Sequence, residues 1–311
     1  MITRFQDLSN EELFYGHKAC AGCGCSLAVR WALKVFGKNT FMAIPACCMS
    51  AVSFNYPHNM AYRINAITTP FPATAAVLTG MAAGARRAGW KEFHVLGIAG
   101  DGGTADIGLQ ALSGALDRQE KVTYLCYDNE AYMNTGIQES GLTPFGAVTT
   151  TTTTGKKLNG GMCKKKDLFH IVAAHQPAYA ATASIGYPLD FFSKLEKAKT
   201  YAEKGTVFLH VIAPCPTGWG YPVEKTVELG KLAVDCGLWN LLEYEGGEYK
   251  VNQQKKDFNK IPEYIKMQNR FKYVTDLEIC EIQRMAEQDW LKLNKRQPEN
   301  VGKLQVEFEQ P

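Results

Sequence analysis

Several features that would assign the protein to a class at once are missing from this sequence. No sustained basic run is present, because the 34 Lys and Arg and the 31 Asp and Glu residues are spread along the chain and leave a net charge of +3; nucleic-acid binding needs a concentrated positive surface. Residues 1–12 lack the basic stretch and apolar run of a secretory signal. The most apolar stretch, 66–85, is broken by Pro70 and Pro72, which does not suit a membrane span. We therefore expect a cytoplasmic protein that binds neither nucleic acid nor membrane.

Cysteine, by contrast, is abundant, with ten in 311 residues. A reducing compartment argues against a disulfide framework. Cys20 and Cys23 form a CxxC pair within a stretch of small residues that leaves room for a metal centre. Further candidate ligands are Cys47, Cys48 and Cys215. The thiols that suit a role as small buried hydrophobic residues are Cys126, Cys236 and Cys280.

Two kinds of metal centre suit this cysteine pattern. A cubane iron–sulfur cluster needs four thiolates, and a zinc site can also use a CxxC pair with two distant cysteines. Spacing alone does not distinguish the two, so both hypotheses stay open at this point.

The middle of the chain alternates between apolar runs and amphipathic segments. Strand-like runs occupy 93–99, 122–127, 179–184 and 207–212, and helix-like segments occupy 107–116 and 189–203. This alternation is typical of parallel βαβ units whose strands are buried on both faces. We predict an α/β fold with a mainly parallel sheet flanked by helices.

The composition changes after about Cys236 toward Lys, Glu, Gln and Asn. An amphipathic helix is predicted over 277–293, and the last residues, 296–311, have two prolines and little periodicity. We therefore expect an α/β domain over residues 1–237, followed by a C-terminal extension and arm over 238–311 that contacts a partner chain. The threonine run 149–154 predicts a loop.

Polar residues follow two of the predicted strands. The first strand runs into Gly100, Asp101, Gly102 and Gly103, and the next is followed by Asn129 and Glu130. Carboxyl ends of parallel strands lie at one edge of a sheet, so the two clusters should converge. Glycines let a backbone approach phosphate closely, and carboxylate and amide oxygens suit magnesium. A GDG turn alone is common, but an Asn 28 positions after Asp101 matches the thiamine diphosphate signature.

Together these segments resemble the beta subunit, the thiamine-diphosphate-binding subunit, of the 2-oxoacid:ferredoxin oxidoreductases of the pyruvate synthase and oxalate oxidoreductase type. The matching segments are 16–24, 100–114, 127–136, 181–184 and 214–219. The resemblance covers about residues 14–240 and implies a thiamine diphosphate-binding fold with the diphosphate-type domain.

The resemblance also implies a set of site residues. The ligands of one [4Fe–4S] cluster would be Cys20, Cys23, Cys48 and Cys215. Cys48 is preferred to Cys47 because it takes the place of the cysteine in the Gly-Cys-(Leu/Met) segment of the family. Magnesium would be held by Asp101, Asn129 and the Ala131 carbonyl, beside the glycines at 100, 102 and 103. Asn134 and Thr135 would be the catalytic residues facing the thiazolium and the substrate, with Gly136 shaping the same wall.

The implied reaction is the oxidative decarboxylation of a small 2-oxoacid, with or without coenzyme A. In this reaction the ylid of thiamine diphosphate attacks the 2-oxo carbon, carbon dioxide leaves, and single electrons pass to the cluster and on to ferredoxin. The segment 49–75 departs from the pattern of the pyruvate enzymes. His58 and Arg63 in this segment would suit a more anionic substrate such as oxalate, although both residue types are most often exposed.

Thiamine diphosphate enzymes hold the cofactor between two α/β domains, and the length after residue 237 is too short for a second one. We therefore expect an alpha-type subunit that supplies the pyrimidine-binding domain and its Glu, together with a ferredoxin-like cluster subunit. Two alternatives are a subunit of a non-oxidative thiamine-dependent decarboxylase and a zinc-stabilised scaffold protein.

Overall fold

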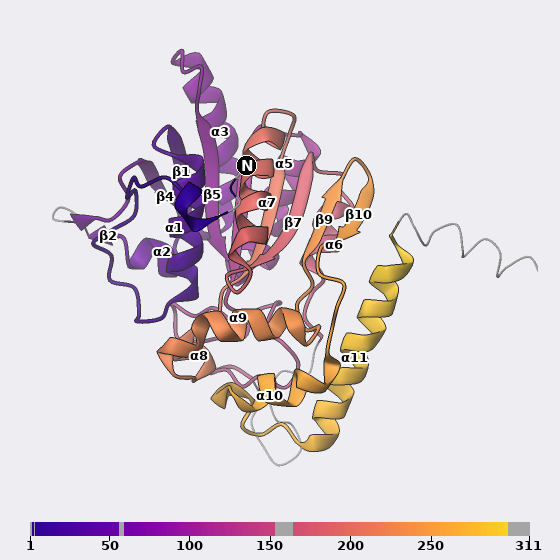
Figure 1. Ribbon diagram of the computed structural model, residues 1–311. Coiled ribbons are helices and arrows are strands. Elements are labelled where there is room, and N and C mark those ends of the chain that lie inside the picture. The colour runs from indigo at the N-terminus through magenta and orange to yellow at the C-terminus, as the bar shows by residue number, and fades with distance from the viewer. Residues whose placement is uncertain (1, 3, 56–58, 153–163, 298–311) are drawn as a thin grey trace, which may run out of the picture.

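The apolar runs of the sequence form the centre of an eight-stranded sheet in the computed structural model of the chain (Figure 1). The structure describes residues 2, 4–55, 59–152 and 164–297. The strands, in sheet order, are β10 (Glu248–Val251), β9 (Leu242–Glu245), β7 (Tyr179–Ser184), β8 (Val207–Ile212), β6 (Thr123–Asp128), β5 (His94–Gly100), β1 (Thr40–Pro45) and β4 (Asn65–Thr69). Neighbouring strands from β7 to β4 are parallel, whereas β9 and β10 are antiparallel.

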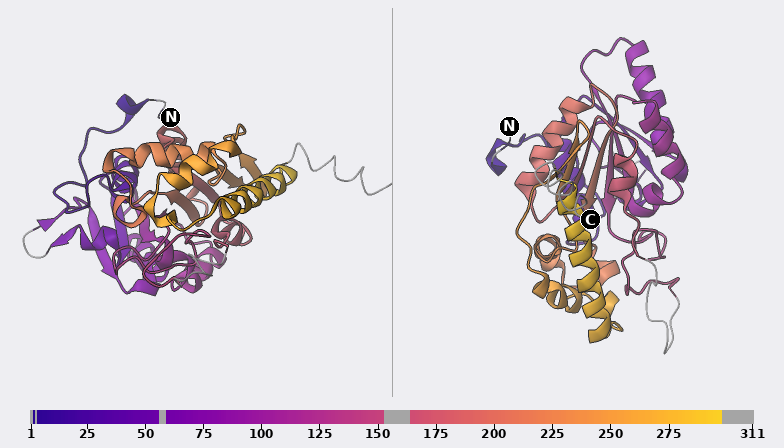
Figure 2. Two further views of the ribbon diagram at one scale, coloured as in Figure 1. Left: turned by 90° about the horizontal axis from the view of Figure 1, so that it is seen from below. Right: turned by 90° about the vertical axis from the view of Figure 1, so that its right-hand side faces the viewer.

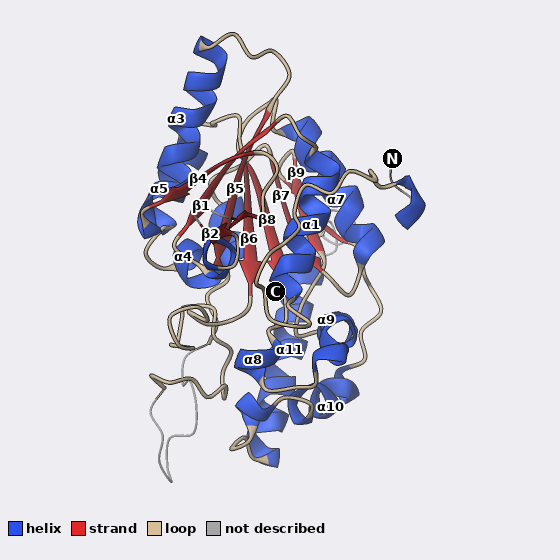
Figure 3. Ribbon diagram, turned by 90° about the vertical axis from the view of Figure 1, so that its left-hand side faces the viewer, coloured by secondary structure: helices blue, strands red, loops and turns tan. Residues whose placement is uncertain are grey.

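Helices cover both faces of the sheet, as the edge-on view in Figure 3 shows. One face carries α1 (Gly24–Phe36) and α7 (Pro188–Tyr201), and the other carries α3 (Thr74–Arg87), α5 (Leu109–Asp117) and α6 (Leu168–Ala173). The short helices are α2 (Cys48–Ala51), α4 (Asp101–Ala105) and α8 (Pro216–Trp219), and a small two-stranded sheet pairs β2 (Phe54–Asn55) with β3 (Asn59–Met60). The 3-10 helices are η1 (Phe5–Asp7), η2 (Phe71–Ala73), η3 (Val223–Lys225), η4 (Phe258–Lys260) and η5 (Asn269–Phe271).

The central strands are apolar along their whole length because both of their faces are buried. Every residue of β6, β7 and β8 is buried. Leu125 and Leu209 pair across β6 and β8 and face α1 and α7, whereas their neighbours Tyr124 and Phe208 face α5 and α6. This arrangement confirms the predicted α/β class with a mainly parallel sheet.

The stretch 66–85, the most apolar of the sequence, divides at its prolines. Residues up to Thr69 belong to the edge strand β4, Pro70 and Pro72 occupy the turn, and α3 begins at Thr74. Within the described residues, no helix combines the length and the apolar character needed to cross a membrane.

The C-terminal extension adds two strands to the edge of the same sheet. β9 pairs antiparallel with β7, and β10 pairs with β9. α9 (Thr226–Asp235), α10 (Ile261–Lys266) and α11 (Asp276–Lys295) share a third apolar cluster, and α11, in yellow, lies on the outside of the molecule in Figure 2. The boundary at residue 237 stays a prediction, and residues 298–311 of the expected arm lie outside the described part.

We expect Leu209→Ala to lower the free energy of unfolding by about 2–5 kcal/mol, because it leaves a cavity between the sheet and α7. Leu209 is completely buried, whereas Leu277 is 83% exposed, so Leu277→Ala is the matched control and should change stability by less than about 0.5 kcal/mol. Urea unfolding of both variants measures the difference, and similar losses in both would contradict the described packing.

Candidate functional site

The two polar clusters predicted to converge do so at the ends of β5 and β6. These strands are neighbours in register, with Gly100 opposite Tyr127. Asp101 and Asn129 are almost completely buried, at 1% and 2% exposure. One end of the Asn129 side-chain amide lies 3.0 Å from Oδ1 of Asp101 and 3.0 Å from the carbonyl oxygen of Ala131. The two residues and the Ala131 carbonyl therefore meet at one point.

The orientation of the Asn129 amide decides what this point can hold. With the nitrogen at this end, the amide donates hydrogen bonds to both neighbouring oxygens. With the oxygen there, three oxygens converge without a hydrogen between them, which is the arrangement that a hard cation such as magnesium requires. Burial and then the Asp128 charge raise the pKa of Asp101, while the Ser140 hydroxyl donates to its Oδ2 at 2.5 Å. The donor set fits a magnesium ion.

A cleft opens beside these oxygens. It is lined by Ala46, Cys47, Cys48, Phe71, Gly100, Asp101, Gly102, Gly103, Tyr127, Asn129, Ala131, Tyr132, Met133, Asn134 and Thr135. A Cβ atom on Gly102 would lie 2.3 Å from the Tyr132 ring, so only glycine fits there. The Tyr132 hydroxyl donates to Asp106 at 2.9 Å, which fixes the ring across the glycine turn.

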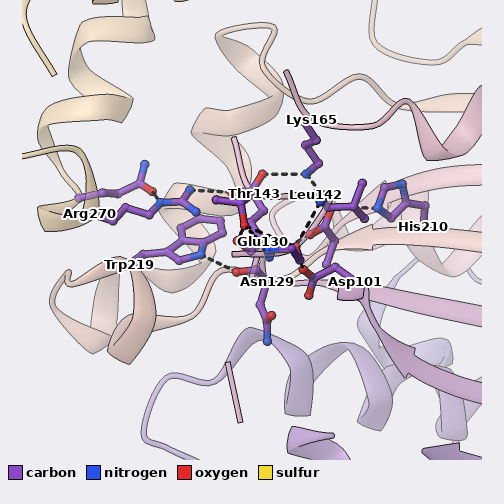
Figure 4. Close-up of polar contacts among 12 residues, drawn as sticks. Asp101, Asn129, Glu130, Leu142, Thr143, Lys165, His210, Trp219 and Arg270 are labelled. Atoms are coloured by element: carbon purple, nitrogen blue, oxygen red, sulfur yellow. Dashed lines mark hydrogen bonds and ion pairs between the residues drawn. The ribbon is translucent and has the colours of Figure 1, made fainter. Parts of the chain in front are cut away.

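The turn after β6 has an unusual backbone that directs its carbonyl groups. Glu130 has a φ of 64°, in the left-handed region that non-glycine residues rarely adopt. The carbonyl of Asn129 accepts a hydrogen bond from the Trp219 indole at 2.8 Å, and the carbonyl of Glu130 accepts one from the Thr143 hydroxyl at 2.8 Å (Figure 4). Both of these carbonyls are thereby turned to protein partners, and the Ala131 carbonyl is the one that faces Asp101.

Buried ion pairs hold this turn from behind (Figure 4). Lys165 Nζ lies 2.8 Å from Glu130 and 2.6 Å from Asp128. Arg270, from the C-terminal extension, approaches Oε2 of Glu130 at 2.6 Å, off the direction of a hydrogen bond, and stacks over the Trp219 ring at 3.7 Å. His210 contacts Asp128 at 2.9 Å.

The charges in this group balance. Burial opposes charge on Asp128, but the Lys165 cation holds the pKa of Asp128 low, and Asp128 and Glu130 in turn raise the pKa of Lys165 against the effect of burial. Burial lowers the pKa of His210, which favours a neutral ring. The carboxylates of Asp128 and Glu130 are thus balanced by two cations, Lys165 and Arg270, beside the site.

The four predicted cluster cysteines lie around one region next to the cleft. Cys20 and Cys23 belong to the tight turn before α1, in which the Cys23 amide donates to the Cys20 carbonyl at 3.1 Å. The Gly24 amide donates to the Pro214 carbonyl at 3.2 Å, which brings this turn against the segment of Cys215. A Cβ on Gly24 would lie 2.7 Å from the same carbonyl, so glycine is required for this approach.

Electrostatic coupling among the thiols supports the same proximity. Burial, and then charge on Cys47, Cys215 and Cys23, raise the pKa of Cys48. Burial raises the pKa of Cys215 to about 11, with Cys23 and Cys20 adding to the shift. Cys48 also lines the cleft beside Asp101.

Among the described residues, no three His, Cys, Asp or Glu side chains surround a point closely enough for a single metal ion. A cubane cluster spreads its ligands more widely than one ion does, so this finding concerns single-ion sites.

Asn134, Thr135 and Gly136 line or adjoin the open side of the cleft and are exposed. The Thr135 hydroxyl donates to Gln138 at 2.5 Å, and Gln138 donates back to the Thr135 carbonyl at 3.0 Å. Arg63 lies elsewhere: it is exposed, and its guanidinium lies over the Tyr15 ring at 4.5 Å. His58 lies outside the described residues.

Comparisons with known proteins place the chain in a family. Residues 46–211 match the model of the thiamine pyrophosphate enzyme, C-terminal TPP binding domain. The chain is 46% identical to the ketoisovalerate oxidoreductase subunit VorB of Pyrococcus horikoshii, over 92% of this chain and 93% of that protein. It is also 46% identical to the pyruvate synthase subunit PorB of Methanothermobacter thermautotrophicus, over 89% of this chain and 95% of that protein.

The chain is a beta subunit of the 2-oxoacid:ferredoxin oxidoreductase family. A solved 2-oxoglutarate:ferredoxin oxidoreductase from Magnetococcus marinus has the same fold, with a TM-score of 0.54 at 18% identity over 74% of this chain and 84% of that one. The predicted family, fold class and enzyme class of this oxidoreductase subunit are thereby confirmed.

Sequence reasoning missed three residues that support the site in this oxidoreductase subunit. The sequence analysis singled out neither Lys165 nor Arg270, and it treated Cys25 only as part of the stretch around Cys23. Cys25 is completely buried between the two parts of the site: its sulfur accepts a hydrogen bond from Nδ2 of Asn129 at 3.4 Å. The neighbouring Cys25 side chain is also the largest cause that lowers the pKa of Cys23, to about 6. The signal in the sequence for Cys25 was the CxxCxC spacing of Cys20, Cys23 and Cys25.

We expect Arg270→Ala to destabilise the chain by about 3–5 kcal/mol, because it leaves the buried Glu130 carboxylate without one of its cations. Arg284→Ala removes a cation from an exposed pair with Glu281 and should cost less than about 1 kcal/mol. Urea unfolding at neutral pH measures both variants, and equal effects would show that the Arg270 pair contributes no more than a surface contact.

Proposed function

We propose that this chain binds thiamine diphosphate through magnesium held by Asp101, Asn129 and the Ala131 carbonyl, and one [4Fe–4S] cluster through Cys20, Cys23, Cys48 and Cys215. In the complex it would take part in the oxidative decarboxylation of a small 2-oxoacid. One observation carries the proposal: Cys48, a candidate cluster ligand, lines the same cleft as Asp101 and Asn129. A cofactor that releases electrons and a centre that accepts them would thus be neighbours.

Thiamine diphosphate, when bound, supplies the carbanion chemistry at the 2-oxo carbon. The residues of this chain bind and orient it. The glycine turn at residues 100–103 gives the diphosphate access to the backbone at the start of α4. Asp101, Asn129 and the Ala131 carbonyl would hold the magnesium ion, whose positive charge would offset that of the diphosphate. Asn134 and Thr135 stand at the open side, where the substrate would enter.

The described lining of the cleft favours a substrate with an apolar tail. Its larger side chains include Phe71, Tyr132 and Met133, and its described members contain no Lys, Arg or His. Oxalate carries two carboxylates and would need a cationic partner, which Arg63 does not provide from its exposed position over Tyr15. We therefore propose pyruvate or a short branched 2-oxoacid as the substrate, in line with the names of the relatives.

A partner subunit is part of the proposal. Asn134, Thr135 and Gly136 are exposed, and carbanion chemistry requires that water be excluded. An alpha-type subunit would cover this open side and supply the pyrimidine-binding Glu. A ferredoxin-like subunit would carry electrons from the cluster toward ferredoxin. The exposed Cys20 marks the side of the cysteine group from which electrons would leave.

We expect Cys215→Ala to lose the iron and acid-labile sulfide of the anaerobically purified chain, because three thiolates hold a cubane cluster poorly. Cys236→Ala is the matched control, since Cys236 is a buried thiol that donates to the Ala233 carbonyl, away from the cysteine group. Iron and sulfide analysis measures both variants. Stoichiometric zinc without iron in the wild-type protein would refute the cluster and favour a zinc-stabilised scaffold.

We expect the reconstituted complex to reduce viologen with pyruvate or 2-oxoisovalerate, and not with oxalate. The described lining of the cleft offers apolar side chains but no Lys, Arg or His that could pair with the second carboxylate of oxalate. Asp101→Asn should abolish most of this turnover by weakening metal binding. The isolated chain should show no turnover. Rapid viologen reduction with oxalate would contradict the substrate class, and carbon dioxide release without viologen reduction would indicate a non-oxidative decarboxylase.

A further inference from the structure

Cys25 lies between the two parts of the proposed site and belongs to neither ligand set. It stands in the first turn of α1, two residues after Cys23, and is completely buried. Its sulfur lies 3.4 Å from Nδ2 of Asn129 and 3.9 Å from the carbonyl oxygen of Ala213. Ala213 comes two residues before Cys215, so Cys25 lies beside the segments of two candidate cluster ligands and one candidate magnesium ligand.

The thiol has a single proton, and this limits its contacts. The carbonyl oxygen of Ala213, 3.9 Å from the sulfur, accepts the hydrogen bond of the Cys25 thiol. With the proton directed to this carbonyl, the remaining lone pairs of the sulfur can only accept a hydrogen bond. The Asn129 amide must then turn its NH₂ group toward Cys25.

This constraint decides the orientation of the Asn129 amide. With Nδ2 held at Cys25, the amide oxygen points to the other side, where Oδ1 of Asp101 and the Ala131 carbonyl lie within 3.0 Å. That is the orientation in which three oxygens face a cation. With the opposite orientation, the nitrogen would donate to Asp101 and Ala131, and the place of the metal would be closed.

We propose that Cys25 is a positioning residue: its thiol donates to the Ala213 carbonyl and accepts from the Asn129 amide, and so presents the amide oxygen to the magnesium of thiamine diphosphate. The inference rests on the proposed function, because it concerns the metal assigned there. It links Asn129 to the segment of Cys215, since Ala213 lies two residues before Cys215. Groups that support a ligand in this way commonly change metal affinity by about 10-fold to 100-fold.

The test uses the reconstituted complex with Mn²⁺ in place of magnesium. Mn²⁺ binding in the presence of thiamine diphosphate is measured by electron paramagnetic resonance for the wild type, Cys25→Ala, Cys25→Ser and Cys236→Ala. Iron content is measured on the same samples. Cys25→Val, which fills the space of the thiol but has no hydrogen-bonding group, replaces Cys25→Ala if the smaller side chain prevents assembly.

We expect Cys25→Ala, or Cys25→Val in its place, to weaken Mn²⁺ binding by about 10-fold or more while the iron content stays at the wild-type value. Cys25→Ser should restore Mn²⁺ affinity, since a hydroxyl also donates one hydrogen bond and accepts others. Cys236→Ala should match the wild type.

Two results would overturn the inference alone. Wild-type Mn²⁺ affinity in Cys25→Ala or Cys25→Val would show that the thiol does not orient Asn129, and loss of iron in these variants would show that Cys25 is itself a cluster ligand. Failure of the wild-type complex to bind Mn²⁺ with thiamine diphosphate would overturn the proposed function together with the inference.

Discussion

The buried ion pairs around Glu130 are the constraint on which the cofactor end of the molecule depends. A non-glycine residue in the left-handed region costs about 1–3 kcal/mol, and it persists only where the surroundings hold it. Lys165 and Arg270 hold the side chain of Glu130, while Trp219 and Thr143 hold the carbonyls on either side of it. The Ala131 carbonyl faces Asp101 because this turn cannot relax.

The same group explains why the chain after residue 237 matters to the site. Arg270 comes from this region, and its backbone carbonyl also accepts a hydrogen bond from Val148, in the loop that follows the turn. Lys165 comes from a different segment and contacts Asp128 as well as Glu130. Segments distant in sequence thus meet at one carboxylate, and the C-terminal extension forms part of the support of the cofactor site.

The sequence predicted those parts of the protein that depend on local pattern. Strands over 179–184 and 207–212 have the predicted bounds, because continuous apolar runs between glycines and helices leave few alternatives. Asp101 and Asn129 could be brought together from the sequence because the ends of parallel strands share one edge of a sheet. Both inferences need only periodicity and the order of elements along the chain.

The parts that the sequence did not predict depend on contacts between distant residues. β9 and β10 are short and half-polar, and their place at the edge beside β7 is set by pairing, which local pattern does not encode. The contact of Arg270 with Glu130 joins residues 140 positions apart, and a charged side chain in a polar segment carries no sign that it is buried. The contact that gives Cys25 its place beside the site is with Asn129, which is 104 positions away.

The close approach of the Cys20–Cys23 turn to the Cys215 segment has a consequence for how such chains diverge. At Gly24 an added methyl group would collide with the Pro214 carbonyl, at 2.7 Å. This glycine is tied to the tight junction between two stretches almost 200 residues apart. In a lineage that no longer used the junction, Gly24 would be among the first positions to drift toward larger residues, so its loss in a distant homologue would mark a changed centre before any cysteine disappears.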